Sequence, residues 1–242
     1  MIKALDSSRQ AMQVQLRRHE VTANNLANVN TPGFKRELSM VTALEAPASG
    51  DAGPGVQSAP RELLVEGRPN LAGGSLSATG NPLDVALAGE GFFQVQSPDG
   101  ARLTRDGSFT LDPQGLLIHS SGYPVLVDGG SVQLSGLPSI LQDGSILDGE
   151  NPAGQLSIVK VGEGGHLMRE GENLFRVEGG TEEMEAGDIQ VASGFLEGSN
   201  VDPIREMVNM IQAFRVYELA QKAANAADQT LQIAVNRVGV LR

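Results

Sequence analysis

The chain has 242 residues, with 18 basic and 29 acidic side chains and a formal net charge of −11. It contains no Cys and only 3 His, which excludes disulfide scaffolds, thiolate metal sites and cysteine nucleophiles and disfavours zinc chemistry. The acidic balance disfavours a nucleic-acid binder, because such proteins need clustered Lys and Arg to neutralise phosphates. An enzyme is therefore a weak starting hypothesis.

The charge is unevenly distributed along the chain. Residues 1–40 carry a net charge of +3 and residues 197–242 are neutral, which leaves −14 on residues 41–196. Near-neutral ends around an acidic centre suggest that the ends and the centre face different surroundings. The alternative is that the acidic residues serve turns, since many of them directly precede glycine, as in Asp99-Gly100 and Asp106-Gly107.

The N-terminal segment to about residue 28 has helical composition, because it lacks Gly and Pro and is rich in Gln, Arg, Ala, Leu and Met. Thr31-Pro32-Gly33 then supplies a helix breaker and a residue that tolerates positive φ. Residues 44–80 are dense in Gly, Ala, Ser and Pro, which indicates an extended connector with room for a strand or two. No apolar run is long enough to span a bilayer.

From residue 83 to residue 192 the helical period is absent. Short apolar runs alternate with Asp-Gly, Ser-Gly and Gly-Gly pieces, which is typical of hairpins and predicts an all-β domain. After it, Asp202 can cap a helix that begins at Pro203 and meets no Gly or Pro before Gly239. Apolar residues recur along it at steps of three or four, and others lie off this stripe, so we expect more than its own chain to cover the helix.

We therefore predict an α+β protein whose terminal α-helices pair as a coiled coil around an inserted all-β central domain. The expected segments are an N-terminal helix and motif (1–36), an extended connector (37–80), a β-rich central domain (81–196) and a C-terminal helix (197–242). A chain lacking residues 1–36 or 203–242 is expected to keep a soluble β domain.

We find no nucleophile elbow, zinc-binding helix, phosphate loop, dinucleotide fingerprint or calcium loop in the sequence. We interpret His19, His119 and His166 as surface or packing residues, because none has a recognisable catalytic partner nearby. The acidic group Glu182, Glu183, Glu185 and Asp188 favours a solvated loop over a cation site. No cofactor or metal site is expected.

Three stretches together carry a family resemblance. They are ANNLANVNTPGFK (23–35), LDVALAGEGFFQV with TRDGSF (83–95 and 104–109), and LEGSNV leading into MVNMI (196–201 and 207–211). In this order they resemble the flagellar basal-body rod and hook family over nearly the whole chain, and within it most closely the proximal-rod member.

The resemblance implies a structural rod subunit without catalysis that helps to transmit torque from motor to hook. Its implied partners are itself, other rod proteins and the flagellar type III export apparatus, with no nucleic acid and no direct membrane insertion. It implies a periplasmic rod location and export without a cleaved signal peptide. The alternatives are the distal-rod member of the family or, from another class, a secreted β-domain hydrolase that uses central carboxylates such as Asp84 and Glu90.

The resemblance also marks candidate assembly residues. The assembly motif comprises Ala23, Asn24, Asn25, Leu26, Ala27, Asn28, Thr31, Gly33 and Phe34. The central motif comprises Leu83, Asp84, Gly91, Phe92, Phe93, Thr104, Arg105, Gly107 and Phe109. The C-terminal interface comprises Glu197, Ser199, Asn200, Val201, Met207, Ile211, Phe214 and Tyr217.

Physical roles can be assigned to some of these residues. Asparagine amides near the end of the first helix can bond across a lattice of identical subunits, or alternatively cap the helix. Gly33 is expected to have positive φ and Phe34 to anchor the chain in a core. Phe92 and Phe93 should point to opposite faces of a sheet, and Arg105 is a hairpin corner or part of an intersubunit ion pair.

Overall fold

The computed structural model describes residues 2–44, 62–136, 138–184 and 189–239. The chain divides into two compact units. Unit 1 contains Met1–Ala27, Glu37–Arg68 and Asp202–Arg242, and unit 2 contains Asn28–Arg36 and Pro69–Val201. The sequence-based boundaries grouped residues 28–36, as a motif, with the N-terminal helix, and in the structure these residues pack with the β unit.

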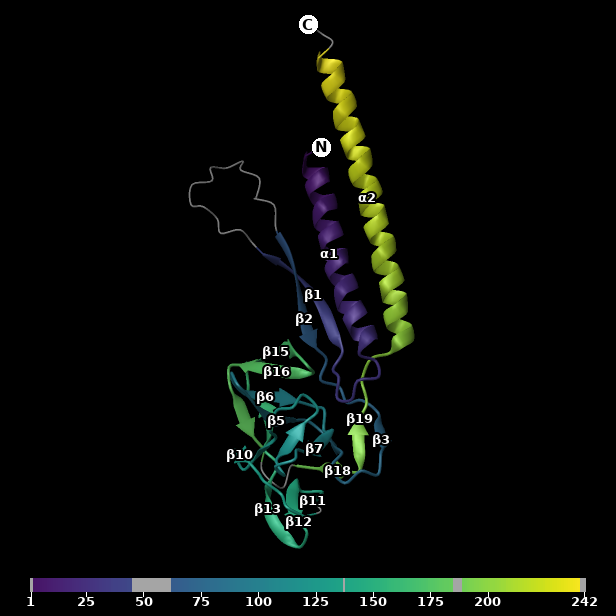
Figure 1. Ribbon diagram of the computed structural model, residues 1–242. Helices are drawn as coiled ribbons and strands as arrows, with labels where there is room; N and C mark the ends of the chain where they lie inside the picture. The colour runs from purple at the N-terminus through teal and green to yellow at the C-terminus, as the bar shows by residue number, and fades with distance from the viewer. Residues whose placement is uncertain (1, 45–61, 137, 185–188, 240–242) are drawn as a thin grey trace, which may run out of the picture. The chain divides into compact units, whose positions relative to one another are not determined.

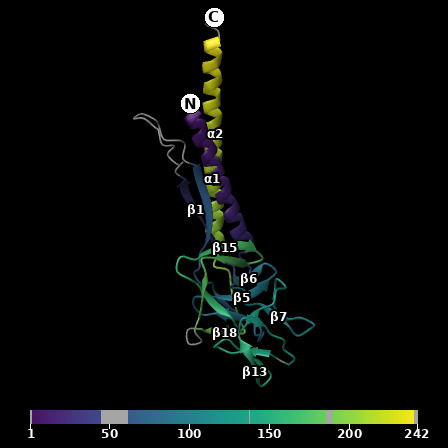
Figure 2. The ribbon, with the colours of Figure 1, turned by 90° about the vertical axis from the view of Figure 1, so that its left-hand side faces the viewer.

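Two helices dominate unit 1 and run side by side in opposite directions (Figures 1 and 2). α1 comprises Ile2–Ala27 and α2 comprises Pro203–Gly239. The Asp202 side chain caps α2 as the sequence predicted, because its Oδ1 accepts the N–H groups of Ile204 at 3.0 Å and Arg205 at 3.1 Å. With a helix at each end and strands between them, the α+β class is confirmed.

A two-stranded sheet of β1 (Glu37–Leu44) and β2 (Glu62–Pro69) lies next in unit 1. Asn25 joins the end of α1 to the start of β1, since its amide donates to the Glu37 carbonyl at 2.9 Å and accepts the Glu37 N–H at 2.8 Å. Both strands fall in the segment predicted to be a connector. Its Gly- and Pro-rich part, residues 45–61, lies outside the described residues.

Unit 2 is built of short strands. They are β3 (Leu76–Ala78), β4 (Val85–Leu87), β5 (Phe92–Ser97), β6 (Gly100–Thr104), β7 (Phe109–Leu111), β8 (Leu117–His119), β9 (Leu126–Val127), β10 (Gly130–Ser131), β11 (Pro138–Ile140), β12 (Ser145–Asp148), β13 (Asn151–Gln155), β14 (Ile158–Val161), β15 (His166–Gly171), β16 (Leu174–Glu178), β17 (Thr181–Glu183), β18 (Val191–Ser193) and β19 (Phe195–Glu197). The predicted β-rich centre is thus present.

The largest sheet has the antiparallel order β15-β16-β6-β5-β14-β17 and uses both of its faces. Because side chains alternate along a strand, Phe93 enters the main core while its neighbour Phe92 points to the other face. On that other face, Phe92 forms a second apolar cluster with Leu103, Val159 and Phe175. Two arginines of the site described below, Arg105 and Arg169, lie over rings of this second cluster.

Neither helix, over its described residues, has the combination of length and hydropathy needed to cross a membrane.

Candidate functional site

A tight turn after α1 brings residues 28–36 into unit 2. Gly33 has φ of +64°, as the sequence predicted, and its N–H donates to the Glu197 carbonyl at 2.6 Å. A Cβ at this position would lie 2.3 Å from the backbone carbonyl carbon of Arg105. Only glycine therefore allows the turn to approach the backbone after β6 so closely.

Phe34 anchors this turn and is 2% exposed. The Arg169 guanidinium lies over the Phe34 ring at 4.2 Å and over the Phe175 ring at 5.0 Å, and donates to the Lys35 carbonyl at 2.6 Å. Asn173 also binds the turn, since its amide donates to the Pro32 carbonyl at 2.8 Å. The turn is thus held by Arg169 of β15 and by Asn173, the residue just before β16.

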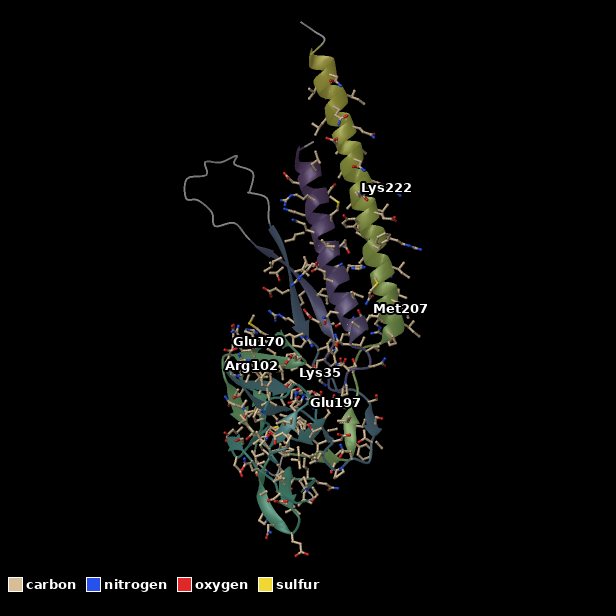
Figure 3. The ribbon with its side chains drawn as sticks, in the orientation of Figure 1. Lys35, Arg102, Glu170, Glu197, Met207 and Lys222 are labelled. Carbon is tan, nitrogen blue, oxygen red and sulfur yellow. The ribbon has the colours of Figure 1, made fainter. Side chains whose placement is uncertain are left out.

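Three buried charges lie next to this anchor. Lys35 Nζ is 2.6 Å from Glu197 Oε1, and Arg105 Nη1 is 3.4 Å from Glu197 Oε2 (Figure 3 labels Lys35 and Glu197). The side chains of all three are at most 4% exposed. We call these three residues the ion cluster.

Backbone groups satisfy most of the remaining hydrogen-bonding capacity of the ion cluster. Glu197 Oε1 also accepts the Gly74 N–H at 2.7 Å, and Lys35 donates to the Ala72 carbonyl at 2.9 Å. Arg105 donates to the Gly89 carbonyl at 2.5 Å and lies over the Phe92 ring at 5.4 Å. The cluster therefore joins backbone from distant parts of unit 2.

Burial lowers the pKa of Lys35, and the hydrogen bond and charge of Glu197 oppose this shift. Burial likewise lowers the pKa of Arg105, again opposed by the Glu197 charge. One carboxylate thus compensates two cations removed from water. If Glu197 were neutral, Lys35 would lose its paired carboxylate and Arg105 would keep only the charge of Glu90.

Asn200 adds a second connection beside the ion cluster. Its Oδ1 accepts the Arg36 N–H at 2.6 Å, and its amide donates to the carbonyls of Asn70 at 2.9 Å and Ala72 at 2.8 Å. Residues 28–36, 70–74 and 197–200 are therefore tied together by backbone and side-chain bonds.

The three motifs of the sequence thus meet at this site, but only some of their residues take part in it. Gly33, Phe34, Phe92, Arg105, Glu197 and Asn200 belong to the site, and Thr104 borders it. Thr31, whose hydroxyl donates to the Asn28 side chain, forms the turn before the site.

Other motif residues of unit 2 lie outside the site. Leu83, Phe93 and Phe109 pack in or against the main core. The Asp84 carboxylate accepts a hydrogen bond from the Asn81 amide, and Gly91 has φ of +120°. Gly107 lies so close to Val85 that a Cβ would be 1.8 Å from its carbonyl oxygen, and Ser199 accepts the N–H of the buried Val201.

The remaining motif residues lie in unit 1. Ala23, Asn24, Asn25, Leu26 and Ala27 form the last turns of α1, and Met207, Ile211, Phe214 and Tyr217 lie on α2. Asn25 is buried, and the nitrogen and the oxygen of its side-chain amide both form hydrogen bonds with the Glu37 backbone at the start of β1. Lattice bonding by the other asparagine amides stays a prediction.

Arg105 has a carboxylate partner inside its own chain. The sequence suggested a hairpin corner or part of an intersubunit ion pair, and in the structure the side chain is 4% exposed and pairs with Glu197 of the same chain. The two residues are 92 positions apart in sequence, so local spacing carried no signal for their pairing. The structure also adds Lys35, Arg169 and Asn173, which the candidate set lacked.

α2 presents an apolar stripe to solvent on the side that α1 does not cover. Met207 is 46%, Ile211 54% and Phe214 55% exposed, whereas Ala213 is 6% exposed. Ile204, Val208 and Leu219 are exposed as well. We call these six exposed residues the α2 stripe: Ile204, Met207, Val208, Ile211, Phe214 and Leu219. Such a continuous exposed apolar surface is typical of a protein contact.

A groove between α1 and α2 borders the α2 stripe. It has a volume of about 290 Å³ and is lined by Gln15, Leu16, His19, Ala213, Phe214 and Tyr217. Phe214 belongs to both surfaces, so the groove and the stripe form one continuous apolar region of unit 1.

One buried group in unit 2, around His119, contains the residue types of a hydrolase site. His119 is 1% exposed and lies 3.3 Å from Asp106, with Ser121 2.7 Å from its Nδ1. This resembles a catalytic triad, but the Ser121 N–H also approaches Nδ1 at 3.1 Å and closes a local turn. These contacts of a 1% exposed imidazole tie neighbouring backbone and side chains together, as in a structural turn.

Among the described residues, no group of three or more His, Asp or Glu is placed to hold a metal ion. Two members of the acidic group considered above, Glu185 and Asp188, lie outside the described residues.

The structure thus combines two helices that carry an exposed apolar stripe with a β unit closed by residues far apart in the sequence. Family models match both ends and the centre. The model described as "Flagella basal body rod protein" matches residues 5–35, "Flagellar hook protein FlgE/F/G D1 domain" matches 86–163, and "Flagellar basal body rod FlgEFG protein C-terminal" matches 192–237.

Full-length relatives agree with these matches. The chain is 36% identical to the flagellar basal-body rod protein FlgF of Caulobacter vibrioides over 94% of each chain, and 33% identical to FlgF of Salmonella typhimurium over 95% of each. It is 34% identical to the rod protein FlgG of Buchnera aphidicola over 96% of this chain and 98% of that protein. The chain belongs to the flagellar basal-body rod protein family. This family consists of structural proteins, so the hydrolase alternative has no support.

Proposed function

We propose that the chain is a structural subunit of the bacterial flagellar basal-body rod that joins its neighbours through the helices of unit 1. The observation that carries the proposal is the α2 stripe, in a chain whose two ends and centre all match rod and hook family models. A stripe of this kind is costly to leave in water and gains stability when another subunit covers it.

The helices of unit 1 pair as an antiparallel coiled coil in this proposal. α1 and α2 run side by side, and the small residue Ala213 lies buried where they face each other. Small residues at a helix contact allow close approach, while larger apolar residues remain available on the other side of α2. The partners of the α2 stripe are further copies of this chain and other rod proteins, with no nucleic acid and no inserted membrane segment.

Within the family, we propose that the chain is the FlgF-type subunit of the proximal rod. Relatives named FlgF support this assignment, and the similar identity to proteins named FlgG keeps the distal-rod subunit as the second candidate. Fractionation of purified basal bodies distinguishes the proximal-rod assignment from the distal-rod assignment. A protein retained in particles that lack the distal rod supports the proximal assignment, and loss together with the distal rod overturns it.

We also propose that the chain passes through the flagellar type III export apparatus without a cleaved signal peptide and is assembled in the periplasm. The absence of Cys supports this route, because a subunit that enters an oxidising compartment unfolded then has no thiols to mispair. Mass spectrometry of the rod-incorporated protein tests it. We expect the rod-incorporated protein to have lost no N-terminal residue other than the initiator Met. Loss of a longer N-terminal segment would contradict the proposal.

The assembly role is tested with Ile211→Asp in cells that lack the wild-type chain. A carboxylate at this 54% exposed position should leave the isolated chain folded but prevent burial of the α2 stripe. We expect basal bodies without the variant and cells without motility. Gln212→Asp, at the adjacent exposed polar position, is the matched control and should assemble normally. Normal rods from the Ile211 variant would exclude the α2 stripe as the assembly surface.

A further inference from the structure

The second face of the large sheet in unit 2 is completed by a segment that is remote in sequence from its strands. Phe92, Leu103, Val159 and Phe175 form the apolar cluster on this face. The chain of contacts that covers it starts at Phe34, continues through Arg169 and reaches the Phe175 ring. Without residues 28–36, Arg169 would lose both the Phe34 ring and the Lys35 carbonyl that hold it over Phe175, so this face of the sheet would lose part of its cover.

The segment 28–36 is in turn held by residues from the far end of unit 2. The Glu197 carbonyl accepts the Gly33 N–H at 2.6 Å, the Glu197 carboxylate binds Lys35, and the Asn200 N–H donates to the Phe34 carbonyl at 3.3 Å. Lys35 and Glu197 are separated by 162 positions. The cover is therefore complete only when both ends of unit 2 are in place.

The charges make this dependence strong. Lys35 and Arg105 are both buried, and Glu197 is the carboxylate that pairs with both of them. A chain in which residues 28–105 had adopted their final positions before residue 197 arrived would contain two buried cations without the carboxylate that pairs with both of them, and only Arg105 would keep the charge of a second acid, Glu90. That state is unfavourable, so the cations and the turn should stay in water until Glu197 is present.

We infer that the ion cluster is a folding latch that lets unit 2 close only after residues from both of its ends, 28–36 and 195–201, have come together. The partly folded chain before that point has an open sheet face and a solvated Lys35. The latch thus makes closure of the β unit depend on the presence of unit 2 from its first residues to its last. This inference concerns unit 2 alone and holds whether or not the chain assembles through unit 1.

Hydrogen exchange of the full-length protein, measured by mass spectrometry, tests the latch with Glu197→Gln. We expect the amides of β5, β6 and β16 to exchange faster by on the order of ten-fold or more, together with those of residues 28–36. Glu178→Gln is the matched control, because it removes a carboxylate from an exposed ion pair with Arg176 on the same sheet. The control should exchange like the wild type.

A milder variant covers the case in which Glu197→Gln does not fold. Lys35→Met removes one cation and leaves Glu197 with Arg105 and the Gly74 N–H, so it should fold and show a smaller increase over the same strands. The double variant Lys35→Met/Glu197→Gln should exchange less than the product of the two single effects predicts, because only one unpaired cation remains. Faster exchange confined to residues 28–36, 70–74 and 195–201, with β5 and β6 unchanged, would overturn the inference.

Discussion

Gly33 shows how one residue type limits the position of a whole segment. Its positive φ alone makes other residues unfavourable, and the contact with the Arg105 backbone adds a steric conflict at 2.3 Å. Gly33→Ala should therefore destabilise unit 2 by more than the ~1 to 3 kcal/mol expected for backbone strain. Urea unfolding of the full chain measures the difference.

Gly122→Ala is the control for this prediction. Gly122 has φ of +84°, but a Cβ there would meet no atom within 4 Å. It should show the cost of strain without the cost of the clash. If both alanine variants lose the same stability, the close approach of the turn to Arg105 is not important.

Asp106 predicts an acid-dependent loss of stability. Burial disfavours its charge, but hydrogen bonds from His119 and Ser108 outweigh burial and hold the pKa of the carboxyl below its ordinary value of 3.8. A depressed pKa in the folded state stabilises the protein above the unfolded pKa, and this contribution disappears as the pH falls through the folded pKa. Asp106→Asn should therefore be less stable at neutral pH and lose less stability on acidification.

Urea unfolding at a series of pH values from neutral to below the ordinary Asp pKa measures this effect. Asp99→Asn, at an exposed carboxylate in the β5–β6 turn, is the control and should follow the wild-type pH dependence. An Asp106 variant with the same pH dependence as the wild type would show that this carboxylate is not linked to folding.

At the scale of elements, the sequence predicted both helices and the β-rich centre but could not decide which side of α2 faces α1. The apolar residues of α2 occur on more than one side, so periodicity alone does not choose between them. The structure places Ala213 inside and Met207, Ile211 and Phe214 outside. The larger apolar residues are thus kept for a partner, and a smaller one allows the intrachain contact.

The two kinds of helix surface predict opposite results. Val14 on α1 is 7% exposed, so Val14→Asp buries a charge and should destabilise unit 1 of the isolated chain by about 3 kcal/mol. Thermal melting followed by far-UV circular dichroism measures this loss. The exposed neighbour Gln13→Asp should melt like the wild type, and so should Ile211→Asp on α2. A Val14 variant with unchanged melting would contradict a stable helix pair in the isolated chain.

At the scale of the molecule, the chain passes repeatedly between its two units. Residues 28–36 belong to unit 2 although the segments on both sides of them, Met1–Ala27 and Glu37–Arg68, belong to unit 1. Composition and periodicity describe each segment separately, so they predicted a positive φ at Gly33 and an anchoring Phe34. They could not predict that Lys35 pairs with Glu197, since no local pattern relates residues 162 positions apart.

This division changes where the β unit can be separated from the rest of the chain. A fragment of residues 28–201 contains all of unit 2, whereas a fragment of residues 37–201 lacks Phe34 and Lys35. The shorter fragment deprives Arg169, which lies over the Phe175 ring, of its contacts with Phe34 and the Lys35 carbonyl, and it leaves Glu197 with one of its two cations. We expect cooperative thermal unfolding from the longer fragment, and aggregation or non-cooperative unfolding from the shorter one. Equal melting temperatures of the two fragments would show that the boundary lies after residue 36, as the sequence alone suggested.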